Sequence, residues 1–215
     1  MMIGTSYMPE RKDMNDMSLV AMKICDDGIV AFADSKASRK DNNDTLFEDI
    51  DRGKIKKVFK NEHFIVVTSG NNEIISDKGV QRIEDIMVEI MKSSTTIDEF
   101  LNEFQLKSKD DNREFNFMFG YKEDGDCFIQ RGRVQDKSIH KLKKETNKTL
   151  LFFQGEKRYC DMLSQMNFHK YNTVQKAKKG IKQLLNYMIH LFNHYNEYNS
   201  VGLPINVEIF HQSFL

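Results

Sequence analysis

The stretch Ser18-Leu-Val-Ala-Met-Lys-Ile-Cys-Asp-Asp-Gly-Ile-Val-Ala-Phe-Ala-Asp-Ser-Lys-Ala37 decides the fold of this chain. It predicts a strand over residues 18–25, a tight turn and a second strand over 29–34, because Asp27-Gly28 between two apolar runs is a strong hairpin signal. Pairing the two strands would bring their outer ends together. Ser18, which opens the first strand, and Asp34, which closes the second, are therefore expected to lie close to each other.

Length and charge set the broad class. The chain has 215 residues, enough for one domain that buries about 70% of its unfolded surface. We expect this domain over residues 18–215, after a polar leader or propeptide-like segment over 1–17. The leader lacks the apolar run of a signal peptide, and no window approaches the length of a membrane span. Lys plus Arg and Asp plus Glu are both 32, and a net charge of zero argues against a nucleic-acid partner.

The cysteines indicate a reducing compartment. The chain has three, Cys25, Cys127 and Cys160. Their number is odd, their spacing is long and no Cys-x-x-Cys occurs, so neither a disulfide framework nor a zinc site is expected. Cys25 and Cys127 lie in apolar runs and are expected in the core. We therefore predict a cytoplasmic protein without a metal or cofactor.

Beyond the hairpin, apolar periodicity predicts the remaining elements. A polar loop is expected over 38–52. Two helices are expected where Ile83, Ile86, Met87 and Ile90 recur at helical spacing and where Thr96 and Glu99 form a capping box. A long amphipathic helix is expected over 173–195. Strands are predicted at 57–59, 63–70, 115–119, 126–131, 149–154 and 205–210.

This order predicts the fold class. Hairpins dominate, so the sheets should be mostly antiparallel, and two amphipathic helical layers each need a sheet face to cover. The prediction is an α+β protein with a four-layer αββα sandwich, that is, two sheets flanked by helices. The periodicities by themselves leave an unrelated α+β domain open.

The hairpin also carries a resemblance to a known family. The Asp-Gly turn and the return Ala33-Asp34-Ser35-Lys36-Ala37 resemble the opening hairpin of proteasome β-type subunits and the bacterial HslV peptidase, which are N-terminal nucleophile (Ntn) hydrolases. The family folds as the αββα sandwich described above. Its mature chains begin with the nucleophile, and the family's spacing from Asp34 leads back to Ser18.

The resemblance implies a mechanism. In this family the N-terminal hydroxyl attacks a peptide carbonyl, and the free α-amine, with an ordinary pKa of about 7.7–8.0, accepts its proton. A Lys activates the hydroxyl, an Asp holds the Lys and a backbone N–H receives the oxyanion. The matching residues here are Ser18, Asp34, Lys57 and Gly70. Two further positions are comparable to the family's Asp-x-x-Ser-Gly-Gly motif: Glu197 and Ser200.

Two other lysines lie near the residue assigned to the family's lysine position. Lys54 and Lys56 lie close to Lys57, and a small error in register would substitute one of them. Taken singly, each candidate also has an ordinary interpretation: a serine at a strand start, an aspartate in a turn, a lysine on the surface. The ordered set over residues 18–70 is what favours a site.

Two functions follow. The first is a proteasome-like peptidase or amidohydrolase of the Ntn-hydrolase type, whose Ser18 is released by cleavage at Met17–Ser18. The second is a catalytically silent assembly or scaffold protein that keeps its leader. The departures from the family favour the second: Met17 stands where the family has Gly, Gly155-Glu156-Lys157 replaces Gly-Ser-Gly, and Ser200-Val201-Gly202 replaces Ser-Gly-Gly.

The partners expected are a peptide or protein substrate, if the protein is active, and further copies of itself, possibly in a ring. An ATPase partner stays undefined. Self-association is predicted through methionines in or near amphipathic stretches, because methionine-rich faces are adaptable contact surfaces; the alternative is that they are core residues. They are Met87, Met91, Met162, Met166 and Met188.

Overall fold

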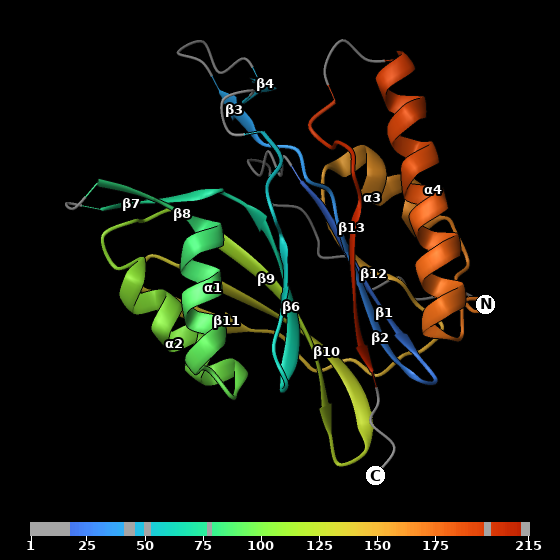
Figure 1. Cartoon of the computed structure of the whole chain (residues 1–215), viewed down its shortest axis with the longest axis horizontal. Coiled ribbons are helices and arrows are strands. Elements are labelled where there is room, and N and C mark those ends of the chain that lie inside the picture. Colours follow the sequence, from blue (N-terminus) through green and yellow to red (C-terminus); the bar gives the residue numbers. More distant parts are fainter. Residues whose placement is uncertain (1–17, 41–45, 50–52, 77–78, 196–198, 212–215) are drawn as a thin grey trace.

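The computed structural model describes residues 18–40, 46–49, 53–76, 79–195 and 199–211. These residues form a four-layer αββα sandwich of two antiparallel sheets with a pair of helices on each outer face (Figure 1). The predicted fold class is therefore confirmed. The predicted leader over 1–17, Met17 included, and Glu197 lie outside the described residues.

The first sheet is built on the opening hairpin. Its order is β12-β1-β2-β13, with every neighbouring pair antiparallel. A two-residue turn at Asp26–Asp27 joins the hairpin strands, so that Cys25 lies opposite Gly28. The strands are β1 (Leu19–Cys25), β2 (Gly28–Ala33), β12 (Phe152–Gly155) and β13 (Asn206–His211).

The second sheet has the order β11-β10-β9-β6-β5 and is also antiparallel throughout. Its strand β6 is packed on both faces, which explains the unbroken apolar run Phe64-Ile-Val-Val67. The strands are β5 (Val58–Lys60), β6 (Phe64–Gly70), β9 (Phe115–Glu123), β10 (Asp126–Gln135) and β11 (Ser138–Lys141).

The helices form the two outer layers (Figure 1). On the five-stranded sheet lie α1 (Ile83–Ser93) and α2 (Ile97–Lys107). On the four-stranded sheet lie α3 (Lys157–Ser164) and α4 (Val174–Tyr195). The capping box predicted at Thr96 and Glu99 is present at the start of α2.

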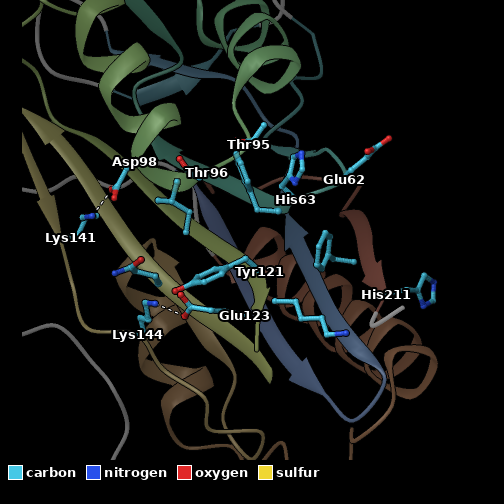
Figure 2. A pocket seen from close by; sticks show the side chains of 15 residues that line it. Glu62, His63, Thr95, Thr96, Asp98, Tyr121, Glu123, Lys141, Lys144 and His211 are labelled. Carbon is cyan, nitrogen blue, oxygen red and sulfur yellow. Dashed lines mark hydrogen bonds and ion pairs between the residues drawn. The ribbon is translucent and has the colours of Figure 1, made fainter. Parts of the chain in front are cut away.

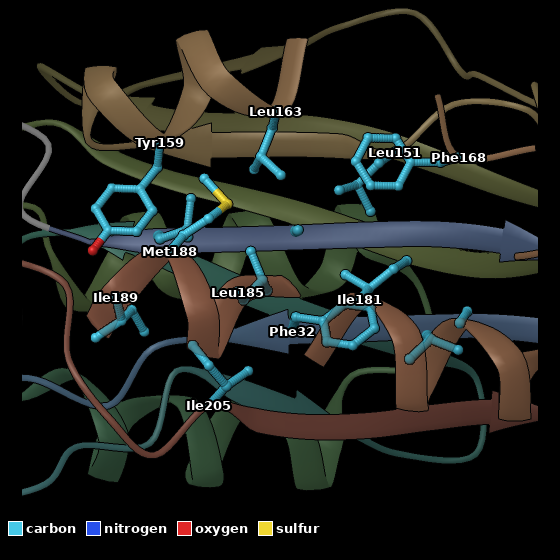
Figure 3. Packing of buried hydrophobic residues seen from close by; sticks show 14 of the residues in the cluster. Phe32, Leu151, Tyr159, Leu163, Phe168, Ile181, Leu185, Met188, Ile189 and Ile205 are labelled. Atoms are coloured by element: carbon cyan, nitrogen blue, oxygen red, sulfur yellow. The ribbon is translucent and has the colours of Figure 1, made fainter. Parts of the chain in front are cut away.

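Three apolar clusters fill the three spaces between the layers. One lies between the sheets and includes Met22, Ile65 and Ile129. A second packs α1 and α2 onto the five-stranded sheet through stacked and edge-on phenylalanines. The third packs α3 and α4 onto the four-stranded sheet, with Phe32 of β2 against Ile181 and Leu185 of α4 (Figure 3).

Some elements differ from the sequence prediction. Part of the expected loop over 38–52 forms a short hairpin, β3 (Ser38–Lys40) and β4 (Leu46–Glu48). A second hairpin, β7 (Glu73–Ser76) and β8 (Gly79–Arg82), precedes α1. Neither these strands nor β11 and α3 were predicted. All are short, and apolar periodicity is a weak signal over three to eight residues.

Three of the five methionines proposed as contact surfaces belong to the core, and the other two are half-buried against it. Met87 and Met188 are fully buried, Met91 is 7% exposed, and Met162 and Met166 pack against the cluster under α4. The self-association prediction therefore loses its methionine basis. Separately, none of the helices in the described part of the chain is long and apolar enough to cross a membrane.

Candidate active site

Three of the predicted site residues meet at one end of the sandwich. Ser18 directly precedes β1, Asp34 directly follows β2, and Lys57 directly precedes β5 of the other sheet. The Lys57 ammonium lies 3.0 Å from Ser18 Oγ and 2.9 Å from Asp34 Oδ1. All three side chains are at most 2% exposed. The hairpin brings Ser18 beside Asp34, and the packing of the two sheets brings in Lys57.

Asp34 is held by four donors. Its Oδ1 accepts from Leu19 N at 2.9 Å as well as from Lys57, and its Oδ2 accepts from Lys36 N at 3.0 Å and Gly202 N at 3.4 Å. Backbone donors from three segments therefore fix the carboxylate. A carboxylate whose lone pairs are used in this way is poorly placed to accept a further proton.

All three N–H donors of the Lys57 ammonium are also engaged in hydrogen bonds. Its Nζ donates to Ser18 Oγ, to Asp34 Oδ1 and, at 3.0 Å, to the carbonyl of Lys36. Three acceptors match the three N–H donors of an ammonium group, so Lys57 fits here as a cation. Lys54 and Lys56 are exposed, and Lys54 Nζ is 3.9 Å from Glu48 at the surface. The lysine beside Ser18 is thus Lys57.

This arrangement stabilises negative charge on the Ser18 oxygen. A buried cation 3.0 Å from a hydroxyl favours the alkoxide that forms during nucleophilic attack. Lys57 and Asp34 are both saturated, so neither offers this hydroxyl a proton acceptor. The nitrogen of Ser18 itself could fill this role: it is an amide when Met17 precedes it and an amine when Ser18 is the first residue.

Gly70 ends β6 with a φ of +95°, a conformation that favours glycine. Two residues earlier, the N–H of Thr68 donates to the carbonyl of Lys57 at 3.0 Å, so this end of β6 runs beside the lysine. Gly70 therefore lies at the Ser18 end of the sandwich, as expected. Its role as an oxyanion donor remains a prediction.

Ser200 lies two residues before Gly202, which contacts Asp34. The Ser200 side chain is buried, and its Oγ has no hydrogen-bond partner among the described residues. An unsatisfied buried hydroxyl is uncommon in proteins. Ser200 is thus in the segment that supports the site, whereas its predicted companion Glu197 lies outside the described residues.

Glu156 is next to Ser18, although the sequence marked it only as a departure from the family. Its N–H donates to the carbonyl of Ser18 at 2.8 Å. Its Oε1 accepts from Arg158 Nε at 2.6 Å, while its buried Oε2 has no partner among the described residues. The residue whose N–H contacts the Ser18 carbonyl therefore carries a buried carboxylate oxygen without a partner among the described residues.

A network centred on Asn199 supports the same end of the molecule, although no sequence motif indicated it. The Tyr159 hydroxyl donates to Asn199 Oδ1 at 3.0 Å, and the Asn199 carbonyl accepts from Lys36 Nζ at 2.7 Å. Asn199 Nδ2 donates to Asn193 of α4 at 2.8 Å. Burial raises the pKa of the Tyr159 phenol, which therefore stays a neutral donor. These contacts join elements far apart in sequence, so no local pattern could predict them.

Solved structures of Anbu share this fold. One is Anbu from Hyphomicrobium sp. strain MC1, with 15% identity, a TM-score of 0.52 and coverage of 90% of this chain and 82% of that chain. A Gly-1 mutant of the same protein has 18% identity and a TM-score of 0.51, covering 90% and 81%. Anbu (ancestral beta-subunit) from Yersinia bercovieri has 14% identity and a TM-score of 0.51, covering 90% and 81%.

The family named from the sequence has to be corrected. No protein-family model matches the chain, and no curated protein matches it. The similar structures named above are Anbu proteins rather than proteasome β-type subunits or HslV. The assignment to the proteasome β-type and HslV family is therefore wrong. At these identities the likeness shows the fold alone.

A separate cavity of about 640 Å³ lies at the far end of β6 (Figure 2). Phe64 opens β6 and lines this cavity, whereas Gly70 closes the strand; seven residues of strand span about 20 Å. In the cavity wall Lys141 pairs with Asp98 and Lys144 with Glu123 (Figure 2). The cavity is therefore distant from Ser18, and these two lysines are already neutralised.

Proposed function

We propose that this protein is a peptidase or amidohydrolase that uses Ser18 as an N-terminal nucleophile after cleavage at Met17–Ser18. The observation that carries the proposal is the buried contact of Lys57 Nζ with Ser18 Oγ at 3.0 Å and with Asp34 at 2.9 Å. A serine hydroxyl that is held against a cation, and that is hydrogen-bonded to no side-chain base among the described residues, suits a nucleophile whose base is its own amine.

The proposed reaction proceeds in two stages. Ser18 Oγ attacks the substrate carbonyl carbon while its proton passes to the α-amine of Ser18. The C–N bond then breaks, the proton passes to the leaving amine and an ester to Ser18 remains. Water, deprotonated by the same amine, hydrolyses this ester. Lys57 stabilises the alkoxide, Asp34 holds Lys57, and the N–H of Gly70 receives the oxyanion.

Ser200 and Glu197 are proposed to orient the freed amine. The support for Ser200 is its buried, unsatisfied Oγ in the segment that reaches Asp34. The proposed substrates are peptides or proteins, processed by an assembly of identical subunits. The burial of Cys25, Cys127 and Cys160 is consistent with the reducing environment of the cytoplasm.

The test compares the full-length chain with a chain that begins at Ser18, using a panel of fluorogenic peptide and amide substrates. The shortened chain should hydrolyse at least one substrate that the full-length chain leaves intact. Ser18→Ala in the shortened chain should abolish this activity, and Lys57→Met should strongly reduce it. Lys60→Met is the matched control, because Lys60 pairs with Glu208 at the surface and should not affect hydrolysis.

The second candidate is a catalytically silent scaffold with an uncleaved leader. The observation that favours it is that Ser18 is only 1% exposed, with Glu156 against its carbonyl. A shortened chain that folds but remains inert on the whole panel would favour the scaffold. Activity of the full-length chain with its leader intact would contradict the N-terminal-nucleophile mechanism.

A further inference from the structure

The two outer helical layers carry opposite charges. The helices α1 and α2 contain six acidic residues and two basic ones. The helices α3 and α4 contain six basic residues and one acidic one, and α4 contributes no acid in 22 residues. The chain as a whole has a net charge of zero, so the charge is separated between two faces rather than in excess.

In the basic layer, Lys157 pairs with Asp161 and Arg158 with Glu156, whereas the charges of the α4 lysines are available for a partner. Lys178 and Lys179 are exposed and Lys182 is half-buried, and none of them has an ion-pair partner among the described residues. On the acidic layer, Asp85 is exposed and likewise lacks an ion-pair partner within the described part of the chain, whereas Glu89 pairs with Lys107. Internal pairing therefore leaves the opposite signs of the two layers in place.

Both layers also expose large apolar side chains. Val88 of α1 is 44% exposed and Leu106 of α2 is 70% exposed, and these residues are the sequence neighbours of the Lys107–Glu89 pair. On α4, Tyr187 is 62% exposed and Tyr195 is 74% exposed. Apolar anchors surrounded by charge are the usual composition of a protein–protein contact, and tyrosine is enriched there.

We propose that the acidic α1/α2 layer of one molecule docks on the basic α3/α4 layer of a second copy of this chain. Each molecule carries both halves of a complementary pair, so no other partner is needed to neutralise either face. The layers lie on opposite sides of the sandwich (Figure 1). The contact is therefore head-to-tail, and repetition adds copies in one direction, giving a stack or an open filament unless rotation closes it.

The two helices of the basic layer supply much of the area that this contact needs. A helix of 22 residues such as α4 is about 33 Å long and, with its side chains, about 10 Å wide. The eight residues of α3 add about 12 Å of helix, so the two helices offer a projected area of about 450 Å². This is more than half of the about 800 Å² that each partner buries in a standard interface. The proposal concerns assembly only and does not depend on the chemistry at Ser18.

Charge reversal provides the test, with sedimentation velocity of the full-length protein at several protein and salt concentrations. Variant one, Lys178→Glu/Lys179→Glu/Lys182→Glu, changes α3/α4 from six basic and one acidic residue to three basic and four acidic ones, so that both of its layers are acidic. Variant two, Asp85→Lys/Glu89→Lys/Glu103→Lys, changes α1/α2 from six acidic and two basic residues to three acidic and five basic ones, so that both of its layers are basic. The wild type should self-associate, less so at high salt. Each variant alone should associate at least about tenfold more weakly, because like charges then face each other.

The decisive sample is the equimolar mixture of the two variants. Head-to-tail docking predicts that mixing restores association, since every contact in the mixture joins an acidic to a basic layer. Lys109→Glu/Lys137→Glu/Lys143→Glu, with the same change of charge as variant one at exposed positions outside the four helices, should behave as wild type. Circular dichroism verifies that the variants are folded.

Three results would overturn the proposal. They are a wild type that stays monomeric at all concentrations, variants that associate as the wild type does, and a mixture that fails to restore association. A basic layer that binds an anionic polymer such as heparin while the wild type remains monomeric would assign the layer to a different partner.

Discussion

Replacing Lys57 by Met is the most informative test of the buried cluster. Methionine has a similar length but no charge, so the change leaves the Asp34 carboxylate, which is 0% exposed, without its cation. Ser18 Oγ and the Lys36 carbonyl lose a donor as well. The expected result is a less stable protein, because an uncompensated buried charge costs far more than an exposed one.

The magnitude follows from the contacts. At the 2.9 Å separation of Lys57 Nζ and Asp34 Oδ1, the Coulomb energy is about 6 kcal/mol for an effective dielectric of about 20. The orphaned carboxylate keeps three backbone donors, from Leu19, Lys36 and Gly202. We therefore expect the low end of the range for breaking a buried pair, about 3 kcal/mol of unfolding free energy. For a chain of this size this corresponds to a fall in Tm of about 6–12 °C.

The assay is urea unfolding followed by far-ultraviolet circular dichroism, combined in a double-mutant cycle with Asp34→Ala. The losses of unfolding free energy in the two single variants should add up to at least about 2 kcal/mol more than the loss in the double variant. Lys60→Met, at a pair whose lysine side chain is 46% exposed, should cost about 0–1 kcal/mol. A loss below about 1 kcal/mol for Lys57→Met, or purely additive losses, would refute the reasoning.

Three further predictions concern other parts of the molecule. Gly155→Ala should prevent stable folding, because the new Cβ would lie 1.8 Å from the Ser18 carbonyl; Gly125→Ala, with open space around it, should be tolerated far better in a solubility and melting comparison. Burial raises the pKa of the Cys25 thiol to about 12, so iodoacetamide near neutral pH should label Cys25 only after unfolding, and rapid labelling of the native protein would contradict its burial. Burial alone would raise the pKa of the Asp111 carboxyl, but hydrogen bonds from Arg113 and Ile75 outweigh it and lower that pKa. Asp111 should therefore stabilise the fold above its unfolded pKa of about 3.9 and lose that contribution as the pH falls further, so that the urea midpoints of wild type and Asp111→Asn should converge in acid and stay apart at neutral pH.

The sequence predicted the parts of the fold that local patterns specify. The Asp-Gly turn and the two apolar runs predicted the hairpin over 18–34, and Thr96 with Glu99 predicted the start of α2. The same hairpin predicted that Ser18 and Asp34 meet. Lys57 was selected among three lysines by its spacing, and its place beside Ser18 depends on the packing of one sheet against the other.

The contacts that the sequence missed arise from tertiary packing. Glu156 meets Ser18 through the pairing of β12 with β1, and Asn199 meets Tyr159 across the junction of α3 and the segment before β13. No periodicity encodes such pairs. The methionines show a different limit of sequence patterns. An amphipathic stripe shows which face of a helix is apolar, but that face can contact either the core or another molecule. For Met87 and Met188, burial decides in favour of the core.

The most direct test of the central claim is the mass of a covalent adduct. The chain that begins at Ser18 and the full-length chain are each treated with a serine-reactive β-lactone, and the modified residue is located by peptide mass spectrometry. The account predicts an adduct on Ser18 in the shortened chain, a much lower yield in its Lys57→Met variant and no adduct on Ser18 in the full-length chain. Equal modification of Ser18 in both chains, or a folded shortened chain that stays unmodified, would contradict it.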